Sequence, residues 1–171
     1  MLVVMMGLPG TGKSAIAEAV AMAIGAPVFS VDPIEATLIR AGITREHRSG
    51  YAAYDLALML ARSQLELGQS AVVDAANYVE IPRAWWRELA AEFAVRRPLI
   101  ECICSDAELH RRRIESRRRN ISGFIYEPSW ADVEKLRTEY EPCDEERLIL
   151  DSVEPLEENV RGAVEYVRSR G

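Results

Sequence analysis

The sequence predicts an α/β fold in which a five-stranded parallel sheet lies between two layers of helices. Three observations support this prediction. Five short β-like runs alternate with longer segments of helical periodicity. The first run, Leu2 to Met6, is continuously apolar, as expected for a strand that is buried on both faces. The 171 residues, of which 49% are hydrophobic, are enough for a single domain, 1–171, with a substantial core.

The expected elements follow each other in regular alternation. Strands are predicted over 2–6, 27–32, from 70 to near 74, 99–105 and 147–151. Helices are predicted after residue 12, over 33–41 and 51–67, from 82, from 105, from 129 and through 156–167. A capping box is expected between Ser105 and Glu108. Since ligands of such sheets bind beyond the carboxyl ends of the strands, the segment 7–14, Asp32 and Asp74 are expected to share one cleft.

A glycine-rich segment between the first strand and the first helix has a specific spacing. Residues 7–14, GLPGTGKS, match G-x-x-x-x-G-K-[ST] at every fixed position. Glycines allow a tight turn with inward N–H groups, and the helix that follows directs its positive end to the same point. Lys13 is expected to bind β- and γ-phosphate oxygens, and Ser14 to bind Mg²⁺. The predicted phosphate-binding residues are Gly7, Leu8, Pro9, Gly10, Thr11, Gly12, Lys13 and Ser14.

Two aspartates follow predicted strands and are candidates for chemistry on the bound phosphate. Phosphoryl transfer to an alcohol benefits from a carboxylate that accepts the hydroxyl proton. We expect Asp32 to be this base and Asp74 to be the carboxylate on the metal side, although either could be the base. Asp32 could instead only cap the helix that starts at Pro33. Asn77 and Tyr78, in the loop after Asp74, are further candidates for substrate contacts.

An arginine-rich segment contains six arginines between residues 111 and 119. Glu115 lies three or four residues from several of them, which favours ion pairs on a helix. Arg113 and Arg117 share a face and have no carboxylate at these spacings, so an anion between them would relieve their repulsion. We expect both to bind the triphosphate from a lid, residues 112–129, that excludes water. The alternatives are a solvated charged face and a basic stripe for nucleic acid.

Composition excludes several other classes of protein. The net charge of −6 argues against general nucleic-acid binding. No apolar run approaches the length of a membrane span, and the N-terminus lacks the basic segment of a signal peptide, so a cytoplasmic protein is expected. Three cysteines, Cys102, Cys104 and Cys143, suit neither a disulfide framework nor a zinc site. Either a monomer or a homodimer is compatible with the sequence.

With these motifs the chain resembles the small P-loop kinases of the nucleoside-monophosphate-kinase-like group. Relatives in that group include gluconate kinase, shikimate kinase, chloramphenicol phosphotransferase and polynucleotide kinase. The matching segments are GLPGTGKS, VFSVD, AVVDAAN, RRRIESR and RLILD, and they span most of the chain. The resemblance implies a P-loop NTPase fold of strand order 2-3-1-4-5, ATP with Mg²⁺, lid arginines at Arg113 and Arg117, and a substrate carboxylate at Asp32.

The sequence departs from this group at two places. Polynucleotide-kinase-like members tend to have an arginine three residues after the aspartate, where this chain has Glu35. The arginines of a nucleotide-binding substrate helix have only loosely placed counterparts, Arg40 and Arg45. The leading hypothesis is therefore a kinase for a small, neutral or weakly charged hydroxyl compound. The alternatives are a polynucleotide 5′-hydroxyl kinase and a regulatory ATP-binding or ATPase module.

Overall fold

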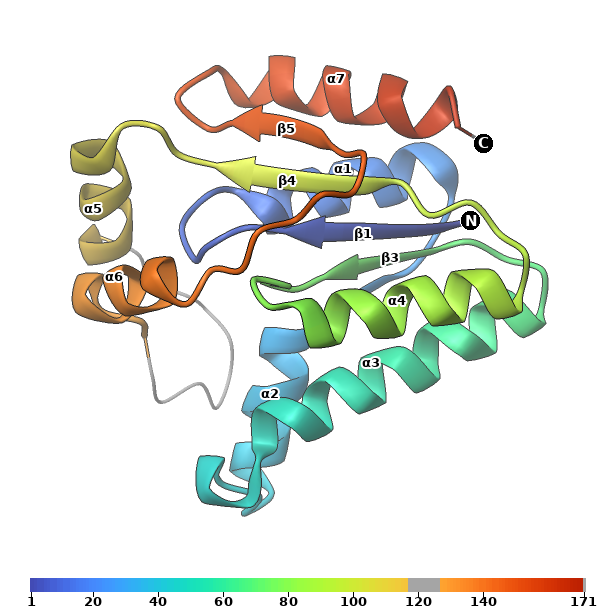
Figure 1. The fold of residues 1–171 in the computed structure, drawn as a ribbon, viewed down its shortest axis with the longest axis horizontal. Helices are drawn as coiled ribbons and strands as arrows, with labels where there is room; N and C mark the ends of the chain where they lie inside the picture. Colours follow the sequence, from blue (N-terminus) through green and yellow to red (C-terminus); the bar gives the residue numbers. More distant parts are fainter. Residues whose placement is uncertain (117–126, 171) are drawn as a thin grey trace.

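A single parallel sheet forms the centre of the molecule (Figure 1). The computed structural model describes residues 1–116 and 127–170. All strand pairs are parallel, and the strand order is β2-β3-β1-β4-β5. The strands are β1 (Leu2–Met6), β2 (Val28–Ser30), β3 (Ala71–Asp74), β4 (Leu99–Ile103) and β5 (Leu148–Asp151). The predicted α/β class, and the strand order implied by the resemblance, are confirmed.

Helices cover both faces of the sheet, as right-handed crossovers between parallel strands require. α1 and α7 pack together on one face, and α3 and α4 lie on the other (Figure 1). α2 packs against α3 near β2. The helices are α1 (Lys13–Ile24), α2 (Val31–Arg40), α3 (Ser49–Glu66), α4 (Glu80–Glu92), α5 (Ala107–Ser116), α6 (Trp130–Thr138) and α7 (Leu156–Arg168), with a short 3₁₀ helix η1 (Arg45–His47). None of the described helices is long and apolar enough to span a membrane.

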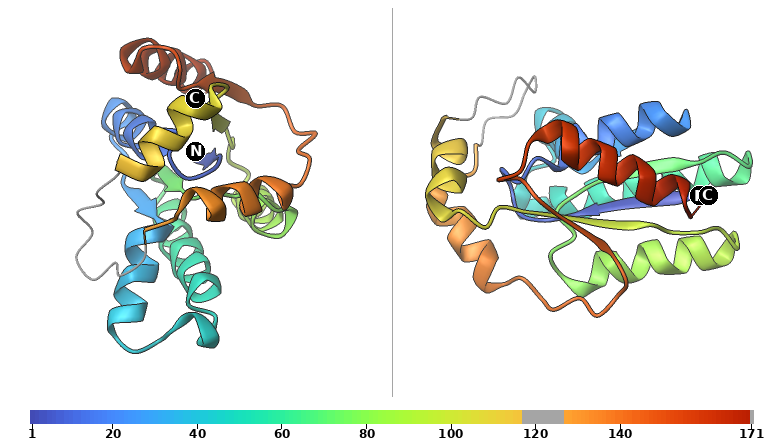
Figure 2. Two further views of the ribbon diagram at one scale, coloured as in Figure 1. Left: turned by 90° about the vertical axis from the view of Figure 1, so that its left-hand side faces the viewer. Right: turned by 90° about the horizontal axis from the view of Figure 1, so that it is seen from above.

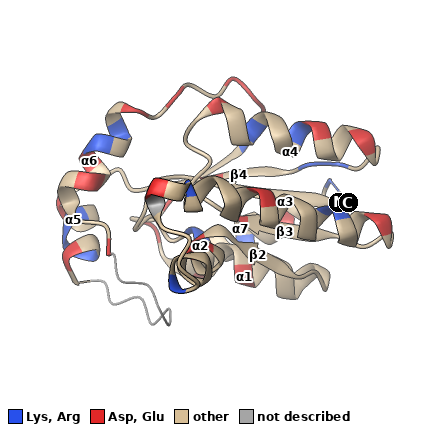
Figure 3. Cartoon of the chain, turned by 90° about the horizontal axis from the view of Figure 1, so that it is seen from below, with Lys and Arg blue, Asp and Glu red and all other residues tan. Residues whose placement is uncertain are grey.

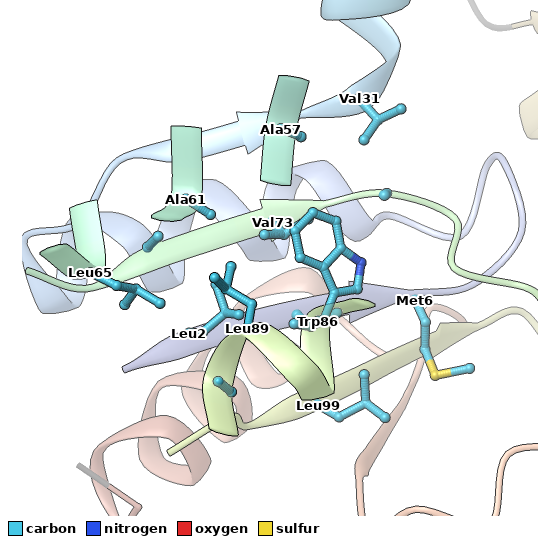
Figure 4. Packing of buried hydrophobic residues seen from close by; sticks show 14 of the residues in the cluster. Leu2, Met6, Val31, Ala57, Ala61, Leu65, Val73, Trp86, Leu89 and Leu99 are labelled. Carbon is cyan, nitrogen blue, oxygen red and sulfur yellow. The ribbon is translucent and has the colours of Figure 1, made fainter. Parts of the chain in front are cut away.

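The two faces of the sheet bury two separate hydrophobic clusters. On the α3 and α4 side, Trp86 is fully buried among aliphatic side chains from these helices and the sheet (Figure 4). On the other side, Val3 and Met5 of β1 contact the apolar face of α1 and α7. Since consecutive residues of β1 point to opposite faces, both clusters need apolar residues from the same strand. This explains the continuous apolar run at residues 2–6.

Several elements begin or end away from the predicted residues. β2 ends at Ser30, so Asp32 lies in the first turn of α2 and not at the end of the strand. α4 begins at Glu80, two residues before the predicted start. The expected capping box of Ser105 and Glu108 is wrong, because Asp106 accepts a hydrogen bond from the Leu109 N–H at 2.9 Å. The capping interaction depends on which carboxylate reaches an N–H, and the sequence allows both.

Two helices, α5 and α6, lie beyond the carboxyl ends of the strands (Figure 2). They contain the start of the predicted lid and the residues that follow it. Ser129 caps α6 as predicted, with Asp132 as its partner in a capping box. Residues 117–126, the middle of the predicted lid 112–129, lie outside the described residues, as does Arg117.

Candidate active site

The segment between β1 and α1 has the backbone of a phosphate-binding loop. Gly7, Gly10 and Gly12 have φ values of 133°, 84° and 86°, which side chains other than glycine rarely adopt. The Thr11 hydroxyl and the Lys13 ammonium group both donate to the Leu8 carbonyl, each at 2.8 Å. Among the described residues, no side chain caps the N-terminus of α1, so the first N–H groups of this helix are left for other acceptors. The loop and the helix end together provide the donors that an anion needs.

Backbone packing on β4 and β3 fixes the start of this loop. A Cβ atom on Gly7 would lie 2.1 Å from the Cys102 carbonyl oxygen, so the loop contacts β4 directly. The Gly7 N–H donates to the Ala76 carbonyl at 2.9 Å. The loop is therefore attached to segments 69 and 95 residues away in sequence, and its shape depends on the whole sheet.

His110 of α5 connects the loop to the two helices beyond the sheet. Its side chain is 1% exposed, and its Nε2 lies 2.7 Å from the Pro9 carbonyl oxygen. Its Nδ1 lies 3.4 Å from Nη2 of Arg137 in α6, and its ring packs edge-on against Trp130. Burial lowers the pKa of His110, against the bond to Pro9, and the nearby Arg137, Lys13 and Arg113 charges lower it further. The neutral ring with a proton on Nε2 satisfies both contacts, because it donates to Pro9 and accepts from Arg137.

A cavity of about 790 Å³ lies beside the phosphate loop. Gly10, Gly12, Lys13 and Ser14 line it on the loop side. Residues from α2, α3, the end of β3, α5 and α6 line the remainder; those with polar side chains are Asp32, Glu35, Tyr54, Asp74, Tyr78, Arg113, Ser116, Asp132, Lys135 and Glu139. Residues of the segment 7–14 therefore share one cleft with Asp32 and Asp74, as predicted.

The two predicted aspartates occupy different environments in this cavity. Asp74 is 8% exposed and accepts a hydrogen bond from the Ser30 hydroxyl at 3.0 Å, which fixes its carboxylate. Asp32 is exposed on the first turn of α2. Ser14 is also exposed and lines the same cavity. These carboxylate and hydroxyl oxygens are of the type that Mg²⁺ binds, and Mg²⁺ needs only one or two of them beside water and phosphate. The donor set therefore fits a Mg²⁺ ion.

Asn77, expected as a substrate contact, instead lies in the protein core. It is fully buried and does not line the cavity. Its Nδ2 donates to the Met5 carbonyl at 2.6 Å, and its Oδ1 accepts from the Trp86 indole at 3.0 Å. Its φ of 48° is in the left-handed region, which asparagine tolerates better than most residues. Asn77 thus joins β1 and α4 beneath the loop after β3.

Two tyrosines line the cavity close to these carboxylates. Tyr78, a candidate substrate contact, lines the cavity, and burial raises its pKa, with Glu139 and Glu141 adding to the shift. The Tyr54 hydroxyl accepts from the Asn77 N–H at 3.2 Å. Burial raises the pKa of Tyr54, with a smaller contribution from the Asp32 and Asp74 charges. Both tyrosines therefore keep their hydroxyl protons near neutral pH.

Arg113 lies between the main cavity and a second one of about 240 Å³. Its guanidinium donates to the hydroxyl and the carbonyl of Ser152, at 2.7 and 2.8 Å. The expected ion pair of Glu115 is present with Arg111, at 2.7 Å. The second cavity also borders the loop and has apolar residues from α1, β4, β5 and α7 in its lining: Ala15, Ile16, Cys102, Leu150 and Leu156. Both cavities share Gly10, Gly12, Ala15 and Arg113.

Comparison with known proteins agrees with this geometry. The sequence model of a protein family described as "AAA domain" matches residues 2–142, which include the phosphate loop and both aspartates. The chain belongs to this family. A search of curated proteins finds no match to the sequence.

This AAA-domain chain shares its fold with solved structures of kinases. A candidate kinase from Chloroflexus aurantiacus has a TM-score of 0.79 at 24% identity, covering 99% of this chain and 97% of the other. A gluconokinase from Sinorhizobium meliloti has a TM-score of 0.72 at 20% identity, covering 98% and 92%. A sugar kinase from Janibacter has a TM-score of 0.73 at 19% identity, covering 98% and 94%. The P-loop NTPase fold implied by the resemblance is confirmed.

Several residues of the AAA-domain site were not identified from the sequence. Tyr54 and Glu139 lie within helical segments, where nothing in the local pattern separates a cavity residue from a surface residue. Glu35 was noted only as a departure from a related pattern, and it lines the cavity. His110 has no sequence neighbour that indicates a contact with Pro9, which is 101 residues away. These positions depend on the packing of α2, α3, α5 and α6.

Proposed function

We propose that the protein is a kinase that transfers the γ-phosphoryl group of ATP to a hydroxyl group of a small molecule. One observation carries the proposal. Lys13 and Ser14 of the phosphate loop line the same cavity as the carboxylates of Asp32 and Asp74. This pairing supports the proposal, because phosphoryl transfer to an alcohol uses an anion site with a base for the acceptor hydroxyl beside it.

In this proposal the nucleoside of ATP binds in one cavity, and its phosphates and the acceptor bind in the other. The nucleoside of ATP occupies the smaller, more apolar cavity, and its phosphates follow the loop into the larger one. Arg113 lies at the junction of the cavities, where it meets the phosphates. The larger cavity then leaves room for an acceptor beside Asp32. The names of two structural neighbours, a gluconokinase and a sugar kinase, are consistent with an acceptor of this size.

Transfer then requires a base that accepts the hydroxyl proton, groups that stabilise the negative charge of the transferring phosphoryl group, and a site from which water is excluded. Asp32 accepts the hydroxyl proton while the acceptor oxygen bonds to the γ-phosphorus and the bond to the β–γ bridging oxygen breaks, which releases ADP. The N–H groups of the loop, the Lys13 ammonium and the Arg113 and Arg117 guanidinium groups stabilise the charge on the transferring group. When bound, Mg²⁺ neutralises phosphate charge, with Ser14 and Asp74 as its protein ligands.

The experiment is a measurement of ADP release with Mg-ATP and a panel of metabolites, antibiotics and oligonucleotides. Strong stimulation by one small alcohol, with a phosphorylated product, supports the proposal. Stimulation by oligonucleotide 5′ ends would instead support the polynucleotide kinase. Turnover that no acceptor changes, but that a protein partner alters, would support the regulatory ATPase module.

Substitution of Asp32 tests its role as the base. For Asp32→Asn we expect kcat to fall by roughly 10²- to 10⁴-fold, with little change in KM for ATP, because a general base contributes to the chemical step. Asp55→Asn is the matched control, since Asp55 is exposed on α3 and does not line the cavity. An equal loss in kcat and in ATP affinity would contradict the assignment and favour a structural role for Asp32.

A further inference from the structure

Tyr54 of α3 lines the larger cavity together with the two aspartates of the site. α3 packs beside α2 (Figure 3), so Tyr54 from one helix and Asp32 from the other reach the same cavity. Besides the effect of burial, the charges of Asp32 and Asp74 raise the pKa of the Tyr54 hydroxyl. For Tyr78, which also lines the cavity, the charges that add to the effect of burial on its pKa are those of two glutamates after α6. Of these two tyrosines, Tyr54 is therefore the one that interacts with the proposed base.

The Tyr54 hydroxyl is held by the loop that follows β3. Its oxygen accepts a hydrogen bond from the Asn77 N–H at 3.2 Å. Asn77 is itself fixed, since its side chain donates to the Met5 carbonyl and accepts from the Trp86 indole. The Tyr54 ring also packs edge-on against Trp85, with 6.4 Å between the ring centres. Contacts with β1, the loop and α4 therefore fix the position of this hydroxyl.

The same hydroxyl has a proton to donate. A phenol oxygen that accepts a hydrogen bond keeps its own O–H proton as a donor. Within the described residues, the Asn77 N–H is the one hydrogen-bond partner of this hydroxyl. Because burial raises the pKa of Tyr54, the proton stays on the oxygen near neutral pH. A ligand oxygen in the cavity can therefore accept a hydrogen bond from Tyr54.

We propose that Tyr54 is a further catalytic residue, whose hydroxyl donates a hydrogen bond to the acceptor hydroxyl that receives the phosphoryl group. This inference rests on the proposed kinase function. The oxygen of an alcohol carries a carbon, a proton and two lone pairs. Asp32 accepts the proton, one lone pair attacks the γ-phosphorus, and the second lone pair accepts from Tyr54, which keeps its own proton throughout. All four directions of the oxygen are then fixed, so the attacking lone pair is aligned with the phosphorus.

The test uses the full chain with Mg-ATP and hydroxyl compounds of different size and charge: glycerol, ribose, glucose, gluconate and ethanolamine. Transfer is measured as kcat/KM for the compound with the highest value. Tyr54→Phe keeps the ring and removes the hydroxyl, and we expect it to lower this kcat/KM by at least about tenfold, because the acceptor loses a hydrogen bond that orients it. Tyr51→Phe is the matched control, since Tyr51 is exposed on α3, packs against the same Trp85 and does not line the cavity.

Binding of a non-hydrolysable ATP analogue separates this role from a purely structural one. Loss of the Tyr54 hydroxyl leaves the Asn77 N–H without this acceptor, and Asn77 also bonds to Met5, which precedes the phosphate loop. A structural role would therefore weaken binding of the analogue as much as it weakens use of the acceptor. We expect calorimetry to show that Tyr54→Phe lowers the affinity for the analogue far less than it lowers kcat/KM for the acceptor. An equal loss in both would overturn the proposal.

The remaining outcomes distinguish this inference from the kinase function. A loss of kcat/KM in Tyr54→Phe below about tenfold, with transfer still present, would overturn the role of Tyr54 and leave the kinase function intact. A loss of similar size in Tyr51→Phe would overturn that role too, because the packing on Trp85 and not the hydroxyl would then be responsible. ADP release that none of the compounds increases would refute the kinase function itself, and the role of Tyr54 with it.

Discussion

The contact between the phosphate loop and α5 can be tested with two glycines of the loop. Gly10 and Gly12 have φ values of 84° and 86°, so alanine is strained to a similar degree at both, by about 1–2 kcal/mol. A Cβ atom on Gly10 would lie 2.7 Å from Ile114 Cδ1 and 3.2 Å from His110 Cδ2, whereas one on Gly12 would have no atom of the described residues within 4 Å. Only Gly10→Ala therefore overpacks the contact with α5.

The expected cost in unfolding free energy follows from these two terms. Overpacking a buried contact costs about 1–3 kcal/mol, so Gly10→Ala should lose about 2–5 kcal/mol and Gly12→Ala about 1–2 kcal/mol. The smaller entropy of the unfolded chain after Gly→Ala affects both variants alike and cancels in their difference. Urea denaturation measures this difference directly.

A second substitution identifies the clashing atom. Ile114→Val removes Cδ1, the atom nearest to the added methyl group. We therefore expect the double variant Gly10→Ala, Ile114→Val to lose about 1 kcal/mol less unfolding free energy than the two single variants lose in sum. If Gly10→Ala costs no more than Gly12→Ala, or if the two substitutions are additive, the phosphate loop does not pack against α5 as described.

Two further predictions concern buried polar residues around the loop. Because burial lowers the pKa of His110, the fold favours its neutral form, and the resulting stability is complete above the unfolded pKa of about 6.5 and is lost as pH falls below it. The advantage of the wild type over His110→Gln in urea denaturation should therefore shrink from pH 7.5 to pH 5; a constant advantage would mean that the pKa is not lowered. Asn77→Ala should lose about 2–6 kcal/mol of unfolding free energy, because it leaves the buried Trp86 N–H and the Met5 carbonyl without this partner, at about 1–3 kcal/mol each. A loss under about 1 kcal/mol would show that these bonds contribute little.

The sequence alone determined the features that depend on short segments of chain. Glycines and the Lys-Ser pair at residues 7–14 require a turn with positive φ before a helix, and the structure has this turn. Apolar runs such as Leu2–Met6 predicted buried parallel strands because such strands need apolar side chains on both faces. The convergence of Asp74 and the phosphate loop followed from the topology, since the carboxyl ends of parallel strands meet at one edge, and Asp32 joins them from the helix turn that directly follows β2.

Only the tertiary structure decided which side chains meet across this edge. Asn77 and Tyr78 are neighbours in sequence, but one is fully buried beneath the loop and the other lines the cavity. Glu35 is fixed by Ser49, and Pro9 is bound by His110, through contacts between separate elements. Local periodicity specifies the face on which a residue lies, but the partner of that face depends on how helices pack over the whole chain. For this reason the sequence predicted the phosphate site, whereas the contacts of Asn77, Glu35 and His110 became visible only in the folded protein.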